Sequence, residues 1–389
     1  MRILRSTHSI NPAIGGPIES IRQSSAALIA RGHEVEIISL DAPTDPWVRE
    51  CPIKVHALGP GRGGYGYEPR FTSWLGQERS SYDAVIVHGL WQYSSFGVWR
   101  VLQETETPYV VFPHGMLDPW FNRTYPIKHL KKMLYWRWAE YRVLRDAAAV
   151  LFTSEQERLL ARKSFSPYRC HEEVVSYGTA APALDLDRAR ESFLAHFPGL
   201  RGKRLILFLG RLHEKKGCDL LVEAFAEVRR ERGTDDLHLV MAGPPANESY
   251  LAELKQCART SGAEAAITFT GMLTGEMKWG AFRAAEVFIL PSHQENFGIA
   301  VVEAMACARP VLVSNQVNIW RELVQDGAGF AEDDNRAGVA RLLQGWLEIA
   351  PPEREAMGLR ARASFEDRFE INHATDSLLR VLHAGMGRS

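Results

Sequence analysis

Short apolar runs, many of them rich in β-branched residues, recur along the chain and alternate with longer segments in which apolar residues repeat at helical spacing. A short apolar run that ends in glycine, proline or histidine is typical of a buried strand. The predicted strands are residues 2–6, 35–40, 84–88, 109–112, 147–153, 173–177, 204–209, 237–242, 267–269, 287–290 and 311–314. The predicted helices include residues 18–30, 154–164, 188–196, 219–230 and the segment from 299 to Pro310. This alternation predicts doubly wound α/β domains with parallel sheets.

The chain has 389 residues, which exceeds one ordinary domain and fits two of about 190 residues each. We place the boundary in the segment around Pro182, so the first domain covers residues 1–180 and the second covers 181–367. Residues 41–80 contain many glycines and prolines and show no clear periodicity. We expect this region to be an irregular, mobile loop.

Composition excludes several classes of protein. The formal net charge is −1, which gives no electrostatic argument for nucleic-acid binding. The five cysteines are odd in number and irregularly spaced, which favours reduced thiols over a disulfide framework or a zinc site. No apolar run approaches the roughly 20 residues of a membrane-spanning helix, and the first residues lack the apolar stretch of a signal peptide. We therefore expect a cytoplasmic protein.

A turn with the sequence Glu-Asn-Phe-Gly joins a predicted buried strand to a helical segment. The first N–H groups of a helix have no partner inside the helix and face the carboxyl edge of the sheet, where they stabilise an anion. We expect this turn, through Asn296, Phe297 and Gly298, to bind the phosphates of a nucleotide. Glu303, inside the helix, would accept from a ribose diol, and Glu295 would face sugar hydroxyls. The alternative is that Glu295 compensates the helix dipole and Glu303 faces solvent.

A second turn follows the predicted strand at 204–209 and carries Arg211 and Lys216 before the next helix. Both cations can converge on one anion, and two fixed cations can replace a metal ion in neutralising a diphosphate leaving group. We therefore expect neither a metal nor another cofactor. The alternative is that these are ordinary surface cations.

The motif Asp185-Leu-Asp187 has the spacing of a metal-binding D-x-D sequence. It precedes a helical stretch instead of following a buried strand. This position favours a helix cap over a metal ligand.

The first domain offers two candidate ligand-binding positions. Gly15 and Gly16 stand before the first helix, with Pro17 at a position that suits the first helical turn, and they would let a ligand approach the backbone. A plain tight turn is the alternative. His88 and His114 end predicted strands, at the edge where α/β domains bind ligands. A lone histidine there is more often a hydrogen-bonded wall residue.

Residues 125–145 alternate basic and aromatic side chains, which is typical of a helix that lies on a membrane surface. We expect Lys128, Lys131, Lys132 and Trp136 to contact an anionic lipid or an acidic carrier. The alternative is an ordinary helix whose long cations cover core aromatics.

The strings Glu-Asn-Phe-Gly-(x)4-Glu-Ala-Met and Gly-Arg-(x)4-Lys-Gly resemble the signatures of the family 4 retaining glycosyltransferases of the GT-B fold. The resemblance implies two Rossmann-like domains that face a central cleft, with the final helix, about 368–389, joining the first domain. It implies that Arg211 and Lys216 clamp a diphosphate and that His114 lies beside the donor sugar. The remaining donor contacts that it implies are Gly15, Gly16, Gly243, Met272 and Leu273.

The resemblance also implies an activity. A retaining glycosyltransferase would move a hexosyl unit from a UDP- or GDP-sugar, such as UDP-glucose or GDP-mannose, to a hydroxyl of a glycan or polyprenyl-linked acceptor. Exopolysaccharide or lipopolysaccharide assembly on the inner face of the plasma membrane is the expected setting.

Two other functions stay open. A glycoside hydrolase could use Glu295 and Glu303 as its two carboxyl groups, although it would need no diphosphate clamp. A non-catalytic nucleotide-sugar-binding subunit could keep the fold, although the full set of Arg211, Lys216, Glu295 and Glu303 is present.

Overall fold

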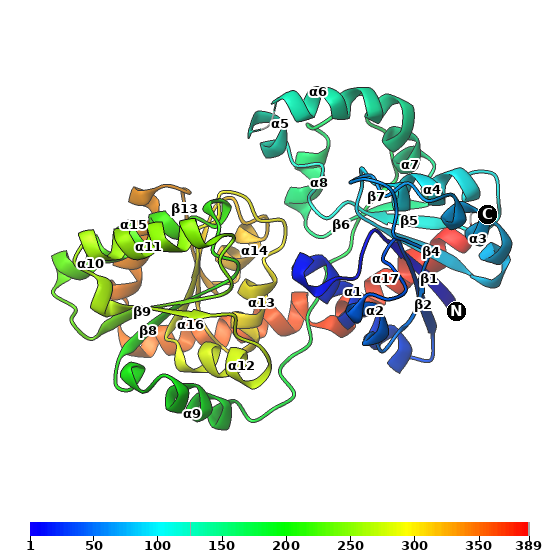
Figure 1. Ribbon diagram of the computed structural model, residues 1–389. Coiled ribbons are helices and arrows are strands. Elements are labelled where there is room, and N and C mark those ends of the chain that lie inside the picture. The colour runs from blue at the N-terminus through cyan, green and yellow to red at the C-terminus, as the bar shows by residue number, and fades with distance from the viewer. Residues whose placement is uncertain (125, 388–389) are drawn as a thin grey trace. The chain divides into compact units, whose positions relative to one another are not determined.

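The structure is a computed structural model and describes residues 1–124 and 126–387 (Figure 1). The chain divides into two compact units. The first unit comprises Met1–Thr179 together with Ile371–Ser389, and the second comprises Ala180–Glu370. Each unit is built on one parallel sheet, as the alternation of strands and helices predicts. The predicted α/β class with two Rossmann-like units is confirmed.

The sheet of the first unit has seven strands in the order β3-β2-β1-β4-β5-β6-β7, and all paired neighbours are parallel. Its strands are β1 (Arg2–Thr7), β2 (Glu34–Ser39), β3 (Lys54–Ala57), β4 (Ala84–His88), β5 (Tyr109–Phe112), β6 (Ala149–Phe152) and β7 (Glu172–Val174). Its helices include α1 (Gly16–Ala30), α4 (Tyr93–Leu102), α5 (Trp120–Thr124), α6 (Pro126–Tyr135), α7 (Tyr141–Arg145), α8 (Glu155–Ala161) and α17 (Ile371–Met386). A π-helical turn, Trp136–Glu140, joins α6 to α7.

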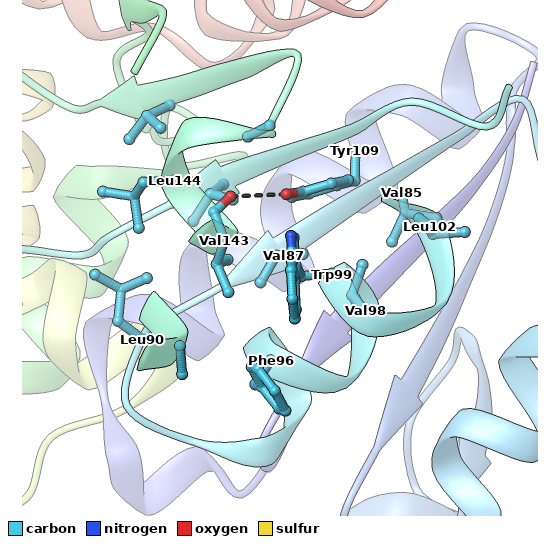
Figure 2. Close-up of a cluster of buried hydrophobic side chains, with 14 of the residues drawn as sticks. Val85, Val87, Leu90, Phe96, Val98, Trp99, Leu102, Tyr109, Val143 and Leu144 are labelled. Atoms are coloured by element: carbon cyan, nitrogen blue, oxygen red, sulfur yellow. Dashed lines mark hydrogen bonds between the residues drawn. The ribbon is translucent and has the colours of Figure 1, made fainter. Parts of the chain in front are cut away.

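The core of the first unit packs α4 and α7 against β4 and β5. Figure 2 shows Val85 and Val87 of β4 in one buried cluster with Phe96 and Trp99 of α4. The hydroxyl of Tyr109 donates to the carbonyl of Val143 at 2.8 Å, so a polar group enters this apolar layer with its hydrogen bond satisfied. The strands are therefore fixed in register, and so are the residues at their carboxyl ends.

The expectation of an irregular loop at residues 41–80 is wrong. This region contains α2 (Pro46–Arg49), the edge strand β3 and α3 (Pro69–Glu78). The helix α3 begins with a side-chain cap from Glu68 to the amide of Arg70 and buries Phe71 and Leu75. The strand β3 lies at the edge of the sheet beside β2 and is mostly half-buried, so its sequence shows no apolar run.

The sheet of the second unit has six parallel strands in the order β10-β9-β8-β11-β12-β13. They are β8 (Arg204–Leu209), β9 (Leu237–Ala242), β10 (Ile267–Gly271), β11 (Val287–Leu290), β12 (Val311–Ser314) and β13 (Gly329–Glu332). The helices include α9 (Leu186–His196), α10 (Cys218–Arg232), α11 (Glu248–Thr260), α12 (Gly275–Ala284), α13 (Ile299–Ala306), α14 (Trp320–Gln325), α15 (Arg336–Glu348) and α16 (Pro351–Ser364). The sheet order reverses between β8 and β11, and in such sheets ligands bind at the carboxyl ends of the strands where the order reverses.

The last helix returns to the first unit. It packs against α1, and Arg31 forms an ion pair with Asp376 at 2.9 Å. The amide of Ile371 donates to the carbonyl of Thr179 at 3.1 Å, so both chain crossings between the units lie side by side.

Candidate active site

The turn between β11 and α13 is held by backbone hydrogen bonds. The amide of Glu295 donates to Gln316 at 3.0 Å, and the carbonyl of Glu295 accepts from Asn318 at 3.0 Å. Gly298, at φ 78°, begins the helix, and within the described residues no side chain caps this end. A left-handed residue at this position favours glycine. The first amides of α13 are thus left at the carboxyl end of β11 without a side-chain acceptor, as an anion site requires.

Phe297 does not face solvent. Its side chain is buried and lies edge-on to Phe369, with ring centroids 5.8 Å apart. Its role in the turn is to anchor the backbone, so only its main chain can serve the predicted phosphate contact. Asn296 accepts a long hydrogen bond from the side chain of Asn318, at 3.4 Å.

The turn between β8 and α10 packs directly against this loop. A Cβ atom at Gly217 would lie 2.2 Å from the carbonyl oxygen of Pro291, so a residue larger than glycine would separate the two turns. The amide of His293 donates to the carbonyl of Lys215 at 2.8 Å. These contacts bring Lys216 to Glu295, and the two side chains form an ion pair.

The charge of Lys216 is set by opposing effects. Burial lowers the pKa of the Lys216 ammonium, and Lys215 and Arg211 act in the same direction. The contacting carboxylate of Glu295 favours the charged form of the lysine and opposes this shift. Arg211 is exposed on the same turn. A diphosphate at this turn would meet two cations, one of them partly desolvated.

Glu303 lies on α13 and is 4% exposed. Lys278 of α12 donates to its carboxylate at 2.7 Å, and the ammonium of Lys278 also lies 4.4 Å from the ring centre of Trp279. The structure therefore places a cation beside the residue for which the sequence predicts a ribose contact. Lys278 was not predicted, because a lysine at a helical position reads as a surface residue.

Three further donor-contact candidates lie at strand ends of the same sheet. A Cβ atom at Gly243 would lie 1.9 Å from the carbonyl oxygen of Gly210, so glycine is required where the ends of β8 and β9 meet. Met272 follows β10 and is 68% exposed, and Leu273 beside it is half-buried. All three therefore lie at the same edge of the sheet as Lys216.

The first unit carries the other predicted residues. Gly15, at φ 91°, immediately precedes α1, and a Cβ atom there would meet no other atom within 4 Å, so the turn is open to a ligand. Gly16 is the first residue of α1. His114 follows β5 and adopts a positive φ of 54°. The amide of the next residue, Gly115, donates to the buried carboxylate of Glu157 at 2.7 Å, which fixes the turn.

His114 is linked to two residues of neighbouring strands. Its Nε2 lies 3.0 Å from Nδ1 of His88, and Nε2 of His88 lies 3.0 Å from Nη1 of Arg5. Burial lowers the pKa of His114 to about 3, and Arg5 contributes in the same direction. Arg5 was not predicted, although a charged residue inside the apolar run of a central strand was the available signal.

The predicted membrane contacts divide between two faces of the helical segment. Lys128 and Lys131 are exposed. Lys132 instead lies 4.5 Å from the ring centre of Trp91, and burial lowers its pKa. Trp136 is 1% exposed and donates to the carbonyl of Pro167 at 2.7 Å. The assignment of Lys132 and Trp136 to a membrane surface is wrong, because both side chains face the core.

The exposed face of this segment carries large apolar side chains. Ile127, Leu130, Leu134 and Trp138 are between 59% and 77% exposed. They recur at spacings of three or four residues, so they form one stripe.

Metal ligands and membrane-spanning helices were sought in the part of the chain that the structure describes. There, no group of three or more histidine, cysteine, aspartate or glutamate side chains is arranged to hold a metal ion. No helix within residues 1–124 and 126–387 is both long and apolar enough to cross a membrane. The side chain of Asp185 accepts from the amides of Asp187 and Arg188, which confirms that this motif caps α9.

Two family models match the two units. A glycosyl transferase 4-like domain matches residues 15–178, and the glycosyl transferases group 1 model matches residues 195–364. The chain belongs to the group 1 glycosyltransferases. The family predicted from the two glutamate- and lysine-containing motifs is confirmed.

Solved structures share the fold of this glycosyltransferase over its whole length. Sucrose-phosphate synthase from Thermosynechococcus elongatus is 21% identical, with a TM-score of 0.79 and complete coverage of both chains. HepE from Anabaena, in complex with UDP and glucose, is 17% identical, with a TM-score of 0.78 and coverage of 98% of this chain and 99% of that chain. At these identities the likeness shows the fold, which is GT-B.

Sequence relatives match over shorter regions. Alpha-D-kanosaminyltransferase from Streptomyces kanamyceticus is 30% identical over 251 residues, which is 62% of each chain. The match spans less than two thirds of the length of this and the next curated relatives.

Proposed function

We propose that this glycosyltransferase moves a hexosyl unit from a nucleoside-diphosphate sugar to a hydroxyl group, with retention of the anomeric configuration. The observation that carries the proposal is the contact between Lys216 and Glu295 beside the amino end of α13. A cation, a carboxylate and a helix amino end without a side-chain cap, at one strand edge of the described chain, match a ligand that carries both a diphosphate and sugar hydroxyls. No metal ion and no other cofactor takes part in this proposal.

The chemistry follows from these groups. The bond between the anomeric carbon and the β-phosphate oxygen breaks, and the electron pair leaves with the nucleoside diphosphate. Arg211 and Lys216 stabilise this charge together with the helix amides. The acceptor oxygen bonds to the anomeric carbon, and its proton passes to an oxygen of the leaving phosphate. Because the leaving phosphate takes this proton, no separate general base is needed, and the role of Glu295 is to orient the sugar hydroxyls.

The test is a panel of UDP-, GDP- and ADP-sugars, each scored for nucleotide release in the presence of chelator. We expect at least one sugar, UDP-glucose or GDP-mannose first, to release nucleotide. Cleavage of simple glycosides without nucleotide would instead identify a hydrolase. Binding of a nucleotide sugar without release in the presence of glycan and lipid-linked acceptors would identify a non-catalytic subunit.

We also propose an acceptor carried on an anionic membrane, such as a polyprenyl-linked glycan of exopolysaccharide or lipopolysaccharide assembly. The support is the apolar stripe on α6 and the following turn, flanked by the exposed cations Lys128, Lys131 and Arg137. Exposed apolar side chains next to cations are suited to the interface of an anionic bilayer. The geometry thus favours a peripheral enzyme that acts on a lipid-linked acceptor.

Sedimentation with phosphatidylglycerol vesicles tests this surface. The double variant Leu130→Ser/Leu134→Ser should lose most of its binding, and Lys128→Glu/Lys131→Glu should lose it as well. Leu359→Ser is the matched control, because Leu359 is 64% exposed on α16 of the other unit. Equal sedimentation of all variants would contradict the proposal.

A further inference from the structure

Arg5 is a buried cation with neutral hydrogen-bond partners. It lies on β1 and is 1% exposed. Its Nη2 donates to the hydroxyl of Ser24 at 2.9 Å, and its Nη1 lies 3.0 Å from Nε2 of His88. A guanidinium group can only donate hydrogen bonds. The contact with His88 therefore requires a lone pair on Nε2 of His88.

This requirement determines where the ring protons lie. A neutral histidine with its lone pair on Nε2 carries its proton on Nδ1. Nδ1 of His88 lies 3.0 Å from Nε2 of His114, so His88 donates and His114 accepts. The two rings are nearly parallel, at 12°, with centroids 5.2 Å apart. Nε2 of His114 thus also carries a lone pair, and the proton of that ring lies on Nδ1.

Nδ1 of His114 is the last nitrogen atom in this series of contacts. The atom is buried and finds no hydrogen-bond partner in the described part of the chain. A buried donor without an acceptor is unfavourable, and native proteins normally satisfy such groups. The positive φ of His114 and the hydrogen bond from Gly115 to Glu157 keep the turn in this conformation. An acceptor atom of a ligand would satisfy the donor.

We propose that Arg5 and His88 are positioning residues that fix His114 as a hydrogen-bond donor through Nδ1, toward an oxygen atom of the bound sugar substrate. The identity of the ligand rests on the proposed function, whereas the direction of the hydrogen bonds does not. The arrangement also means that His114 cannot remove a proton from the acceptor hydroxyl, because its only lone pair is engaged by His88. Burial lowers the pKa of both rings, in agreement with neutral histidines.

The direct test is nitrogen-15 NMR of the full chain labelled at histidine, with the His114 signals assigned by comparison with His114→Asn. We expect His114 in the Nδ1–H form. A charged ring or the Nε2–H form at His114 in the wild-type protein would overturn the proposal. This measurement needs no donor sugar, so its outcome is independent of the proposed activity.

Variants separate positioning from folding. Arg5→Met removes the obligatory donor, and we expect a mixture of tautomers at His114. Ser24→Ala removes the other partner of Arg5 and should leave the Nδ1–H form unchanged. Should Arg5→Met fail to fold, His88→Phe tests the same step, since it removes the donor to His114 and should abolish the tautomer preference. An unchanged Nδ1–H form in every folded variant of Arg5 and His88 would contradict the proposed chain.

The kinetic test uses two amides that imitate the two ring nitrogens. The side-chain amide of His114→Asn lies near the position of Nδ1, and that of His114→Gln lies near Nε2. We expect His114→Asn to retain on the order of tenfold more kcat than His114→Gln, because only the former can donate at the position of Nδ1. The reverse order would overturn the proposal. Loss of transfer in the wild type with every sugar would refute the proposed function and leave the NMR result standing.

Discussion

At the carboxyl ends of the two sheets, the ionisable side chains have different kinds of partner. In the second unit, Glu295 contacts Lys216 and Glu303 contacts Lys278, so each carboxylate has a cation beside it. In the first unit, Arg5 contacts a histidine and a serine. Glu140, near the end of β4, accepts from the amide of Trp91 at 2.7 Å and from the hydroxyl of Ser95 at 2.9 Å.

This difference has a consequence for ligand binding. An ion pair can exchange its partner for a charged group of a ligand, because a phosphate oxygen accepts a charge-assisted hydrogen bond from the ammonium as a carboxylate does. A chain of neutral rings offers a donor in one fixed direction instead. Under the proposed function, the second unit is therefore suited to a diphosphate whose charge grows during the reaction, and the first is suited to uncharged sugar hydroxyls.

The largest effect is expected when the ammonium group of Lys216 is removed from the second unit. Lys216→Ala should lower kcat for transfer by about 10²–10³-fold. Enzymes that lose one preorganised donor to the charge developing in the transition state lose activity by about this factor. The measurement is nucleotide release under saturating donor, with circular dichroism to show that the variant is folded.

Lys203→Ala is the matched control, since Lys203 precedes β8 at the opposite end of the strand and is exposed. It should transfer at the wild-type rate. If Lys216→Ala were as active as this control, the second unit would not stabilise the leaving group through its lysine.

The second unit was also the easier one to predict. The expected strands at 204–209, 237–242, 287–290 and 311–314 coincide with β8, β9, β11 and β12, because central parallel strands are apolar on both faces. The pairing of Lys216 with Glu295 depends on the packing of Gly217 on Pro291, 74 residues apart in the sequence. Tertiary contacts of this kind leave no local pattern.

The site residues of the first unit were harder to predict, because their positions in the structure differ from those that the surrounding sequence pattern predicts. Lys132 and Trp136 belong to a basic, aromatic segment, and only the structure shows that they face Trp91 and Pro167. Arg5 lies within an apolar strand, and its partner His88 is 83 residues away. The motifs thus indicated the family and the strand edge, whereas hydrogen-bond direction required coordinates.

A smaller effect is expected from the buried acid of the first unit. Burial raises the pKa of Glu140 to about 7, and the contacts with Trp91 and Ser95 only partly oppose this. The folded protein therefore holds a proton that the unfolded chain releases near pH 4.5. The contribution of Glu140 to the free energy of unfolding is fully present below that pH and is lost as the pH rises through about 7. This contribution is about 3 kcal/mol at most.

Glu140→Gln keeps an oxygen for both donors and cannot ionise. In urea unfolding followed by tryptophan fluorescence, its free energy of unfolding relative to the wild type should increase between pH 5 and pH 8. A difference that does not change with pH would show that Glu140 is ionised in both states.

The smallest effect concerns the aspartate motif that starts α9. Asp185 accepts from Asp187 and Arg188 at 2.9 and 3.1 Å, and Asp187 pairs with Arg283 at 2.8 Å. Asp185→Ala should cost about 1 kcal/mol of unfolding free energy, whereas Asp185→Asn should cost almost nothing, because asparagine caps a helix equally well. A metal site would behave differently, since an amide is a much weaker ligand than a carboxylate. Equal transfer by Asp185→Asn and the wild type, with and without chelator, would therefore limit the motif to capping and leave charge neutralisation in the second unit to its lysines and arginine.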